Sequence, residues 1–100
     1  MVFIDEKELK KLEEIYKLFG SITRLKILLR LERGECNAGE LADFCGLTQS
    51  ATSHQLKDLR QHKIIKARKD GVNIFYSLSD HHILKMLLSG VEHVREIGCG

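Results

Sequence analysis

The sequence contains no proline and no tryptophan, and only three of its 100 residues are cysteine. Because prolines, repeats and low-complexity tracts are missing, no linker divides the chain, and we expect a single domain over residues 1–100. Long apolar runs are missing too, since Lys, Arg or Glu interrupts each run well before the ~20 residues of a membrane helix. The opening stretch, MVFIDEKELKK, shows no signal-peptide pattern. These absences predict a cytoplasmic protein with no membrane partner.

The cysteines, Cys36, Cys45 and Cys99, do not form a disulfide framework. Their number is odd, and no two of them have the C-x-x-C or C-x-C spacing of a metal or redox motif. This usage suits a reducing cytoplasm. We expect Cys45 to be a small buried apolar residue and Cys99 to be the thiol most open to oxidation or to metal.

An excess of charge of one sign is also missing. The formal net charge is +2 and the isoelectric point is near 8.5, so the total charge says little about a nucleic-acid partner. The distribution of the charges along the chain is more informative. A hydrophobic content of 43% with 30% charged residues is ordinary for a globular chain. Since a domain of this size builds only a modest core, a dimer would supply additional burial.

Apolar residues at helical spacing predict two helices in the first third of the chain. The first covers residues 5–18, with Asp5 as its N-cap. The second lies in SITRLKILLRLERGE and is closed by Gly34. The residues that define the apolar spacing of these helices are Leu9, Leu12, Ile15, Tyr16, Phe19, Ile22, Leu25, Ile27, Leu28 and Leu31, the last five of which we expect to point inward.

The remaining elements predict a winged helix-turn-helix. A short third helix runs from an Asn37 cap to the turn CGLT, in which Thr48 caps a fourth helix, TQSATSHQLKDLRQHK. The stretch IIKARKDGVNIFYSLS then alternates and has Asp70-Gly71 between its arms, which is typical of a two-stranded hairpin. Asp80 begins a last helix. Two helices joined by a tight turn and followed at once by a hairpin favour a mainly α fold with a β-hairpin wing.

The fourth helix and the hairpin carry the side chains that we expect to contact DNA. The front of the helix is short and polar, which suits hydrogen bonds to base edges or phosphates in a major groove. Cations follow and give this region a local positive surplus. The predicted DNA-contacting residues are Gln49, Ser50, Thr52, Ser53, His54, Gln55, Lys57, Arg60, Arg68 and Lys69. The alternative is a solvated helix with an ordinary charge run, and the helix-turn-helix order favours DNA.

The last helix carries two pairs of residues whose side chains commonly bind metals. Asp80 and His82 stand at its front, and His93 and Glu96 stand near its end. Eleven residues of α-helix rise roughly 16 Å, so the two pairs share a face of the helix but cannot reach the same ion. Each pair therefore looks like half of a site. The alternative is that Asp80 is only an N-cap and that the histidines form a polar helix face.

The segment LTQSATSHQLKDLRQHKIIKARKDGVNIFYSLSD resembles the recognition helix and wing of the ArsR/SmtB metalloregulatory repressors. GSITRLKILLRL resembles their second-helix signature, although Ile22 replaces the proline that is usual there. The resemblance extends over residues 15–96. It implies a homodimeric winged-helix repressor that binds a palindromic operator on double-stranded DNA until an effector releases it, with the first and last helices forming the dimer interface.

The same resemblance implies how the two half-sites meet. In this family the C-terminal helices pair antiparallel across a two-fold axis, and both pairs of residues here are centred near position 88. Two sites per dimer would result, each with Asp80 and His82 from one subunit and His93 and Glu96 from the other. Two imidazoles and two carboxylates suit Zn²⁺, with Co²⁺ or Ni²⁺ as alternatives.

The resemblance also implies a route from the metal to DNA. A metal-bound His93 would donate a hydrogen bond from its second ring nitrogen toward Lys63 and Ile64 at the end of the fourth helix. Zinc would then release the operator and derepress genes for metal efflux or sequestration.

Three alternatives differ in signal or in class. The first is a repressor of the same fold that senses thiol oxidation or arsenite through Cys36 or Cys99. The second is a small metalloenzyme, against which the sequence offers no H-E-x-x-H motif, so we expect no enzymatic activity. The third is a structural dimerisation module, which would not need a polar front on its fourth helix.

Overall fold

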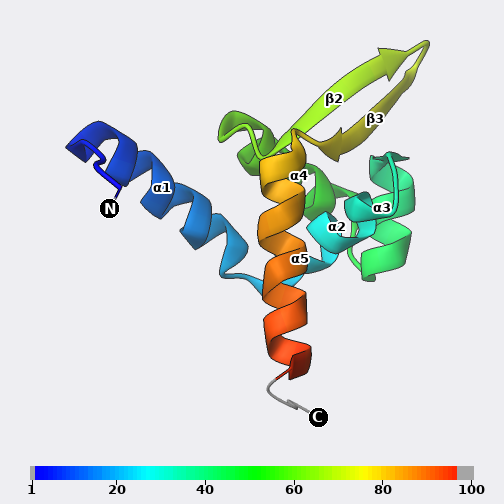
Figure 1. The fold of residues 1–100 in the computed structure, drawn as a ribbon. Helices are drawn as coiled ribbons and strands as arrows, with labels where there is room; N and C mark the ends of the chain where they lie inside the picture. Colours follow the sequence, from blue (N-terminus) through cyan, green and yellow to red (C-terminus); the bar gives the residue numbers. More distant parts are fainter. Residues whose placement is uncertain (1, 97–100) are drawn as a thin grey trace.

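The chain folds as a winged helix-turn-helix, as the sequence predicts (Figure 1). The computed structural model describes residues 2–96. Its elements, in chain order, are α1 (Glu6–Phe19), α2 (Ile22–Glu32), β1 (Cys36–Asn37), α3 (Ala38–Cys45), α4 (Gln49–Gln61), β2 (Ile65–Asp70), β3 (Asn73–Leu78) and α5 (His81–Glu96).

Side-chain caps fix where the helices begin. The carboxylate of Asp5 accepts the amide of Glu8 at 2.8 Å, and Asn37 forms the same capping box with Glu40 at the start of α3. The Thr48 hydroxyl accepts the amide of Ala51 at 3.1 Å and begins α4. These three predicted caps are confirmed. The caps at Asn37 and Thr48 fix where α3 and α4 begin, the two helices of the helix-turn-helix.

The sheet has three strands in the order β1-β3-β2, whereas the sequence predicted two. Cys36 pairs with Tyr76 and Asn37 pairs with Phe75. A strand of two residues is too short to show an alternating pattern, which is why the prediction missed it. The short strand attaches the wing to the start of α3.

The wing turn lies one residue later than predicted. Asp70 pairs with Asn73, so the two loop residues are Gly71 and Val72 rather than Asp70 and Gly71. Gly71 has a φ of 63°, whereas the φ of Val72 is not positive. A positive φ at only the first loop position matches a type II′ turn, which favours glycine there. The turn leaves Val72 97% exposed at the wing tip.

The core lies between α2, α3, α4, the base of the sheet and the first half of α5, which contributes Ile83 and Leu87. Ile27, Leu28, Leu41, Leu59 and Ile64 are fully buried there, and Leu56 is nearly so. One predicted core residue is wrong, because Ile22 is 75% exposed. It is the first residue of α2, directly after the Ser21 cap.

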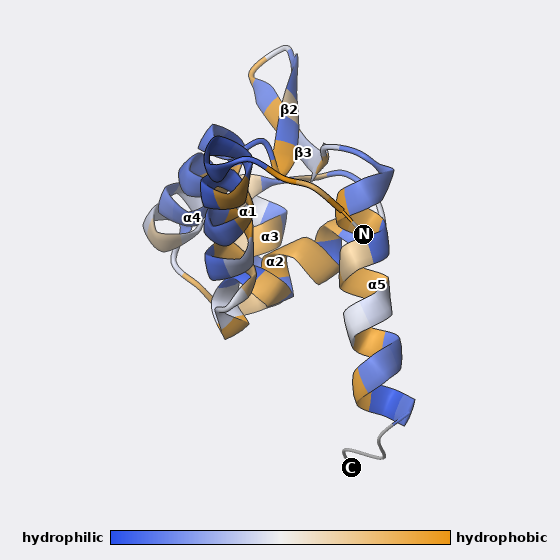
Figure 2. Ribbon diagram, turned by 60° about the vertical axis from the view of Figure 1, so that its left-hand side comes forward, coloured by the Kyte–Doolittle hydropathy of each residue, from blue (hydrophilic) through white to orange (hydrophobic). Residues whose placement is uncertain are grey.

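α1 and α5 project from this body and leave apolar side chains uncovered (Figures 1 and 2). The α1 residues Leu9, Leu12 and Tyr16 are 46%, 37% and 59% exposed, and Leu88 and Val94 of α5 are 38% and 49% exposed. No helix within residues 2–96 is long and apolar enough to cross a membrane.

Candidate nucleic-acid interface and metal half-sites

The front of α4 and the wing enclose an open cleft. It has a volume of about 390 Å³ and is lined by Gln49 and Ser53 of α4, by Ile74 and Tyr76 of β3, and by the start of α3. A second hollow of about 410 Å³ continues along α4 past Ser53 to Lys57 and Arg60. Ser53 borders both hollows. We call α4 the reading helix. The reading helix and the wing therefore face a common space, the arrangement in which a winged helix-turn-helix contacts DNA.

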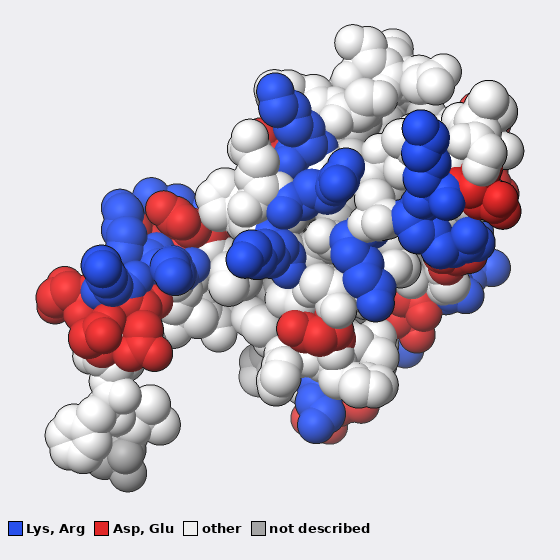
Figure 3. Space-filling model, turned by 90° about the horizontal axis from the view of Figure 1, so that it is seen from above, with Lys and Arg blue, Asp and Glu red and all other residues white. Residues whose placement is uncertain are grey.

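Most of the residues predicted to contact DNA lie on the surface. Those that the structure exposes are Gln49, Ser50, Ser53, His54, Lys57, Arg60, Arg68 and Lys69. From above, Figure 3 shows Lys and Arg side chains gathered over much of the upper face, with Asp and Glu mainly at its edges. This charge distribution suits a phosphate backbone.

The prediction that Thr52 contacts DNA is wrong. Its side chain is fully buried. Its hydroxyl donates to the carbonyl oxygen of Thr48 at 3.0 Å, one turn back along α4. The sequence pattern placed it among polar neighbours, but its position on the helix points into the core.

Gln55 is only half exposed and is held by a side chain that the sequence analysis did not single out. Nη1 of Arg24, in α2, donates to the Gln55 side-chain oxygen at 3.2 Å. The Nε and Nη2 atoms of the same guanidinium donate to the carbonyls of Leu18 and Lys17 at 2.7 and 3.3 Å. Arg24 thus ties the end of α1 to the reading helix.

The cations of the wing differ in their partners. Arg68 forms a two-point ion pair with Glu35 and lies 3.8 Å from Asp70. The hydrogen bond with Arg68 lowers the pKa of the Glu35 carboxyl, and the same bond raises the pKa of Arg68. Lys69, the neighbouring cation, lies on the exposed surface.

The front half-site sits at the start of α5. Oδ1 of Asp80 accepts the amides of His82 and Ile83 at 2.9 and 3.2 Å, and it lies 3.4 Å from Nδ1 of His82. The backbone hydrogen bond from Ile83 is the main cause that lowers the pKa of Asp80. Asp80 is therefore an N-cap with a carboxylate that stays charged, and the exposed side chains of Asp80 and His82 remain open to a ligand.

The rear half-site lies at the other end of α5, where His93 and Glu96 are both exposed. Within residues 2–96 of a single protomer, no three potential metal ligands come together. The chemistry of the four donors fits Zn²⁺, but each end of α5 supplies only two of them. A four-ligand site at either end would therefore need two donors beyond those that residues 2–96 bring together there.

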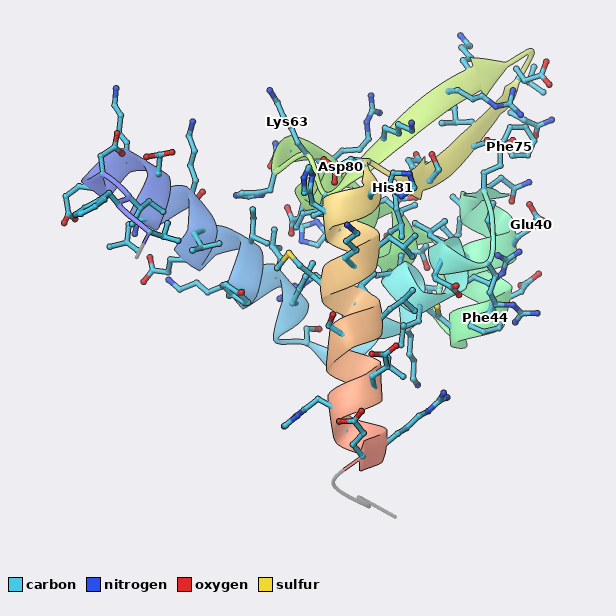
Figure 4. The ribbon with its side chains drawn as sticks, in the orientation of Figure 1. Glu40, Phe44, Lys63, Phe75, Asp80 and His81 are labelled. Atoms are coloured by element: carbon cyan, nitrogen blue, oxygen red, sulfur yellow. The ribbon has the colours of Figure 1, made fainter. Side chains whose placement is uncertain are left out.

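The residues predicted to carry the coupling lie where α4 ends. Lys63 adopts a left-handed φ of 57°, and the amide of Ile64 bonds back to Leu59 at 3.0 Å, which closes α4 in a Schellman motif. The Ile64 carbonyl accepts the amide of Ser79 at 3.0 Å, just before α5. Figure 4 shows Lys63 and Asp80 at the same end of α5, the end far from the C-terminus.

Two of the three thiols are buried. Cys36 is fully buried and Cys45 is 8% exposed, and burial raises the pKa of both thiols. Burial and a raised pKa both disfavour reaction of these thiols with an oxidant or arsenite. Cys99 lies outside the described residues.

Known proteins are similar to this chain in sequence and in fold. The profile of the arsR family of bacterial regulatory proteins matches residues 21–67. The HTH-type transcriptional regulator NmtR of Mycobacterium tuberculosis is 30% identical over 97 residues, which cover 97% of this chain and 81% of that protein. A transcriptional repressor SmtB homolog of Synechocystis is 31% identical over 87 residues, and the match covers 87% of this chain but 66% of that protein.

Solved structures of such regulators are also similar to this chain. The crystal structure of the AntR antimony-specific transcriptional repressor has a TM-score of 0.85 with 30% identity, and the match covers 100% of this chain and 91% of that one. The solution structure of apo-NmtR has a TM-score of 0.80 with 29% identity, and the match covers 100% and 84% of the two chains.

Proposed function

Because the chain belongs to the arsR family of bacterial regulatory proteins, which are transcriptional regulators and not enzymes, we propose that it is a metal-responsive repressor. In this proposal the metal-free homodimer binds a palindromic operator through α4 and the wing. Zn²⁺ at two inter-subunit sites weakens that binding, with Co²⁺ or Ni²⁺ as alternative metals. The observation that carries the proposal is the pair of exposed, incomplete half-sites on α5.

A dimer through α1 and α5 is supported by the apolar surface on these helices. A hollow of about 380 Å³ opens between the start of α2 and α5 and is lined by Phe19, Leu25, Leu29 and Val91 among other residues. Contiguous apolar surface of this kind marks an interface. A Cβ added at Gly90 would meet nothing within 4 Å, so a second helix has room to approach closely near the centre of α5.

The half-sites suit an antiparallel pair of α5 helices. Because both pairs of residues are centred near position 88, one two-fold axis there would bring Asp80 and His82 of one subunit to His93 and Glu96 of the other. Two nitrogen and two oxygen donors form a set that suits zinc and is poor for soft thiophilic ions. The bound ion would supply positive charge and a fixed ligand geometry.

The proposed release of DNA works through the spacing of the reading helices. The ligands lie on α5 and not on α4, so metal and operator do not compete for the same atoms. Holding the two α5 helices at one angle would fix the separation of the two α4 helices, and half-sites in DNA lie a fixed helical repeat apart. Release then requires only that the metal-bound dimer fits this repeat less well than the metal-free dimer does.

His93 is the proposed transmitting residue. His93 lies in the last turn of α5, whereas Lys63 lies near Asp80 at the start of that helix, so the hydrogen bond from His93 would reach the α4 terminus of the other subunit. The left-handed Lys63 is the more accessible acceptor there, because Ile64 is fully buried and its carbonyl already accepts from Ser79. We therefore prefer the backbone at Lys63 to Ile64 as the receiving end.

The proposal is tested by titrating Zn²⁺ into protein bound to an operator duplex selected from a random pool, with fluorescence anisotropy as the readout. Wild-type protein should release the duplex. Asp80→Ala and His82→Ala should still bind the duplex without metal and should need far more zinc to release it. His81→Ala is the matched control, because His81 is an exposed neighbour outside the proposed site. Release that is equally sensitive to zinc in all four proteins would refute the site.

A further inference from the structure

The sheet register sends the two neighbouring wing cations to opposite faces. Successive residues of a strand alternate in direction, and directly paired residues share a face. Lys69 pairs with Ile74, which lines the cleft shared with Ser53 of α4, so Lys69 lies on the side of the wing that faces the reading helix. Arg68 pairs with Phe75 and lies on the other face.

On that face the Arg68 guanidinium uses two of its five N–H donors in hydrogen bonds to Glu35. Its Nε donates to one carboxylate oxygen of Glu35 at 3.0 Å, and its Nη2 donates to the other. It also lies 4.9 Å from the centre of the Phe75 ring, so that the cation stacks on the aromatic face. Figure 4 shows Phe75 at the β3 side of the wing. Two parallel charge-assisted bonds make this a geometrically specific contact.

The pair bridges the sheet from edge to edge. Glu35 immediately precedes β1, Arg68 belongs to β2, and Phe75 of β3 lies between them. The pairing of β1 with β3 involves only two residue pairs, so the wing has few backbone bonds to the body at this edge. The ion pair adds a second attachment beside Asn37, which caps α3.

We propose that Glu35 and Arg68 form a clamp that sets the angle of the wing, and that Lys69 rather than Arg68 is the wing's phosphate contact. A phosphate that approaches Nε and Nη2 of Arg68 would have to displace a carboxylate that already accepts from both atoms, and at Nη1 it would meet the Asp70 carboxylate 3.8 Å away, so contact with Arg68 would gain little. Arg68 is thus a positioning residue. The inference rests only on the DNA-binding part of the proposed function, and its test contains chelator and no metal. Its failure is therefore distinguishable from a failure of metal sensing.

The salt dependence of DNA binding separates the two roles. Each phosphate contact contributes about 0.9 to the slope of log K against log salt. Because each dimer carries two Lys69 side chains, Lys69→Ala should flatten the slope by about 1.8, whereas Arg68→Ala should leave the slope of the wild type and lower the ratio of operator to random-sequence affinity. Glu35→Ala should free the guanidinium and steepen the slope, and this effect should vanish in the Glu35→Ala/Arg68→Ala double variant.

A slope that flattens as much in Arg68→Ala as in Lys69→Ala would overturn the clamp. An Arg68→Ala protein with unchanged affinity and unchanged sequence preference would overturn it as well. A measurement on wild-type protein avoids any effect of substitution on folding. The NMR signal of the Arg68 Nε–H should keep its position and slow exchange when operator is added, and a large shift would show that DNA takes the guanidinium from Glu35.

Discussion

Replacing Arg24 with alanine should be one of the most destabilising changes at a polar position. The half-buried guanidinium donates to two carbonyls at the end of α1 and to Gln55 of α4. The change leaves the carbonyls of Leu18 and Lys17 without this cap and frees Gln55. We therefore expect a weaker attachment of α1 to the body and a less ordered reading helix.

The magnitude follows from the three hydrogen bonds. The bonds to Leu18 and to Gln55 are part-buried, and the bond to Lys17 is exposed. Bonds to a charged donor contribute about 1.5 kcal/mol each when partly shielded and less at the surface, which gives about 3 kcal/mol for Arg24→Ala. For a chain of this size, each kcal/mol lowers the melting temperature by about 4–8 °C.

Urea and thermal unfolding at one fixed protein concentration measure this loss, because the stability of a dimer depends on concentration. Lys26→Ala is the matched control: Lys26 is exposed on the same helix, and surface changes of this kind stay within about 0.5 kcal/mol. Arg24→Lys should recover only part of the loss, since an ammonium cannot reproduce the planar fork. A loss below about 1 kcal/mol for Arg24→Ala would refute the assigned role of these bonds.

Three further predictions concern the reading helix and the wing. Ser53→Ala should weaken operator binding more than random-sequence binding in an anisotropy assay, because base contacts specify, and equal losses on both duplexes would contradict its role. Thr52→Val keeps the shape of a buried side chain, so it should change stability by less than about 1 kcal/mol and leave operator affinity unchanged. An NMR titration of the Glu35 carboxyl should give a midpoint below the ordinary glutamate value, which returns toward that value in Arg68→Ala. A lowered pKa of Glu35 stabilises the fold at pH values above the ordinary glutamate pKa. The contribution of the clamp to stability should therefore be lost only as the pH falls through the Glu35 midpoint.

Local signals predicted most of the fold. The caps Asp5, Asn37 and Thr48 are short-range contacts within one helical turn, so residue type and spacing were enough to find them. The β-hairpin followed from its alternation and its glycine. The position of the turn was wrong by one residue, because Asp-Gly and Gly-Val both offer a glycine and only the strand register decides between them.

The features that the sequence did not predict depend on distant partners. Arg24 meets Gln55 from 31 positions away, and Arg68 meets Glu35 from 33 positions away, so no local pattern joins them. The burial of Thr52 depends in the same way on how α4 packs onto the body. Asp80, His82, His93 and Glu96 could be singled out because they repeat at the two ends of one helix, while their assembly into a site stays a prediction about two chains.

A mixed dimer tests the inter-subunit metal site most directly. One subunit would carry Asp80→Ala with His82→Ala, and the other would carry His93→Ala with Glu96→Ala. Each homodimer then lacks both complete sites, whereas the mixed dimer regains one site built from the intact pair of each subunit. We predict that zinc binds with high affinity to the mixed dimer, at one ion per dimer, and to neither homodimer. Tight zinc binding by either homodimer, or none by the mixed dimer, would contradict the proposal.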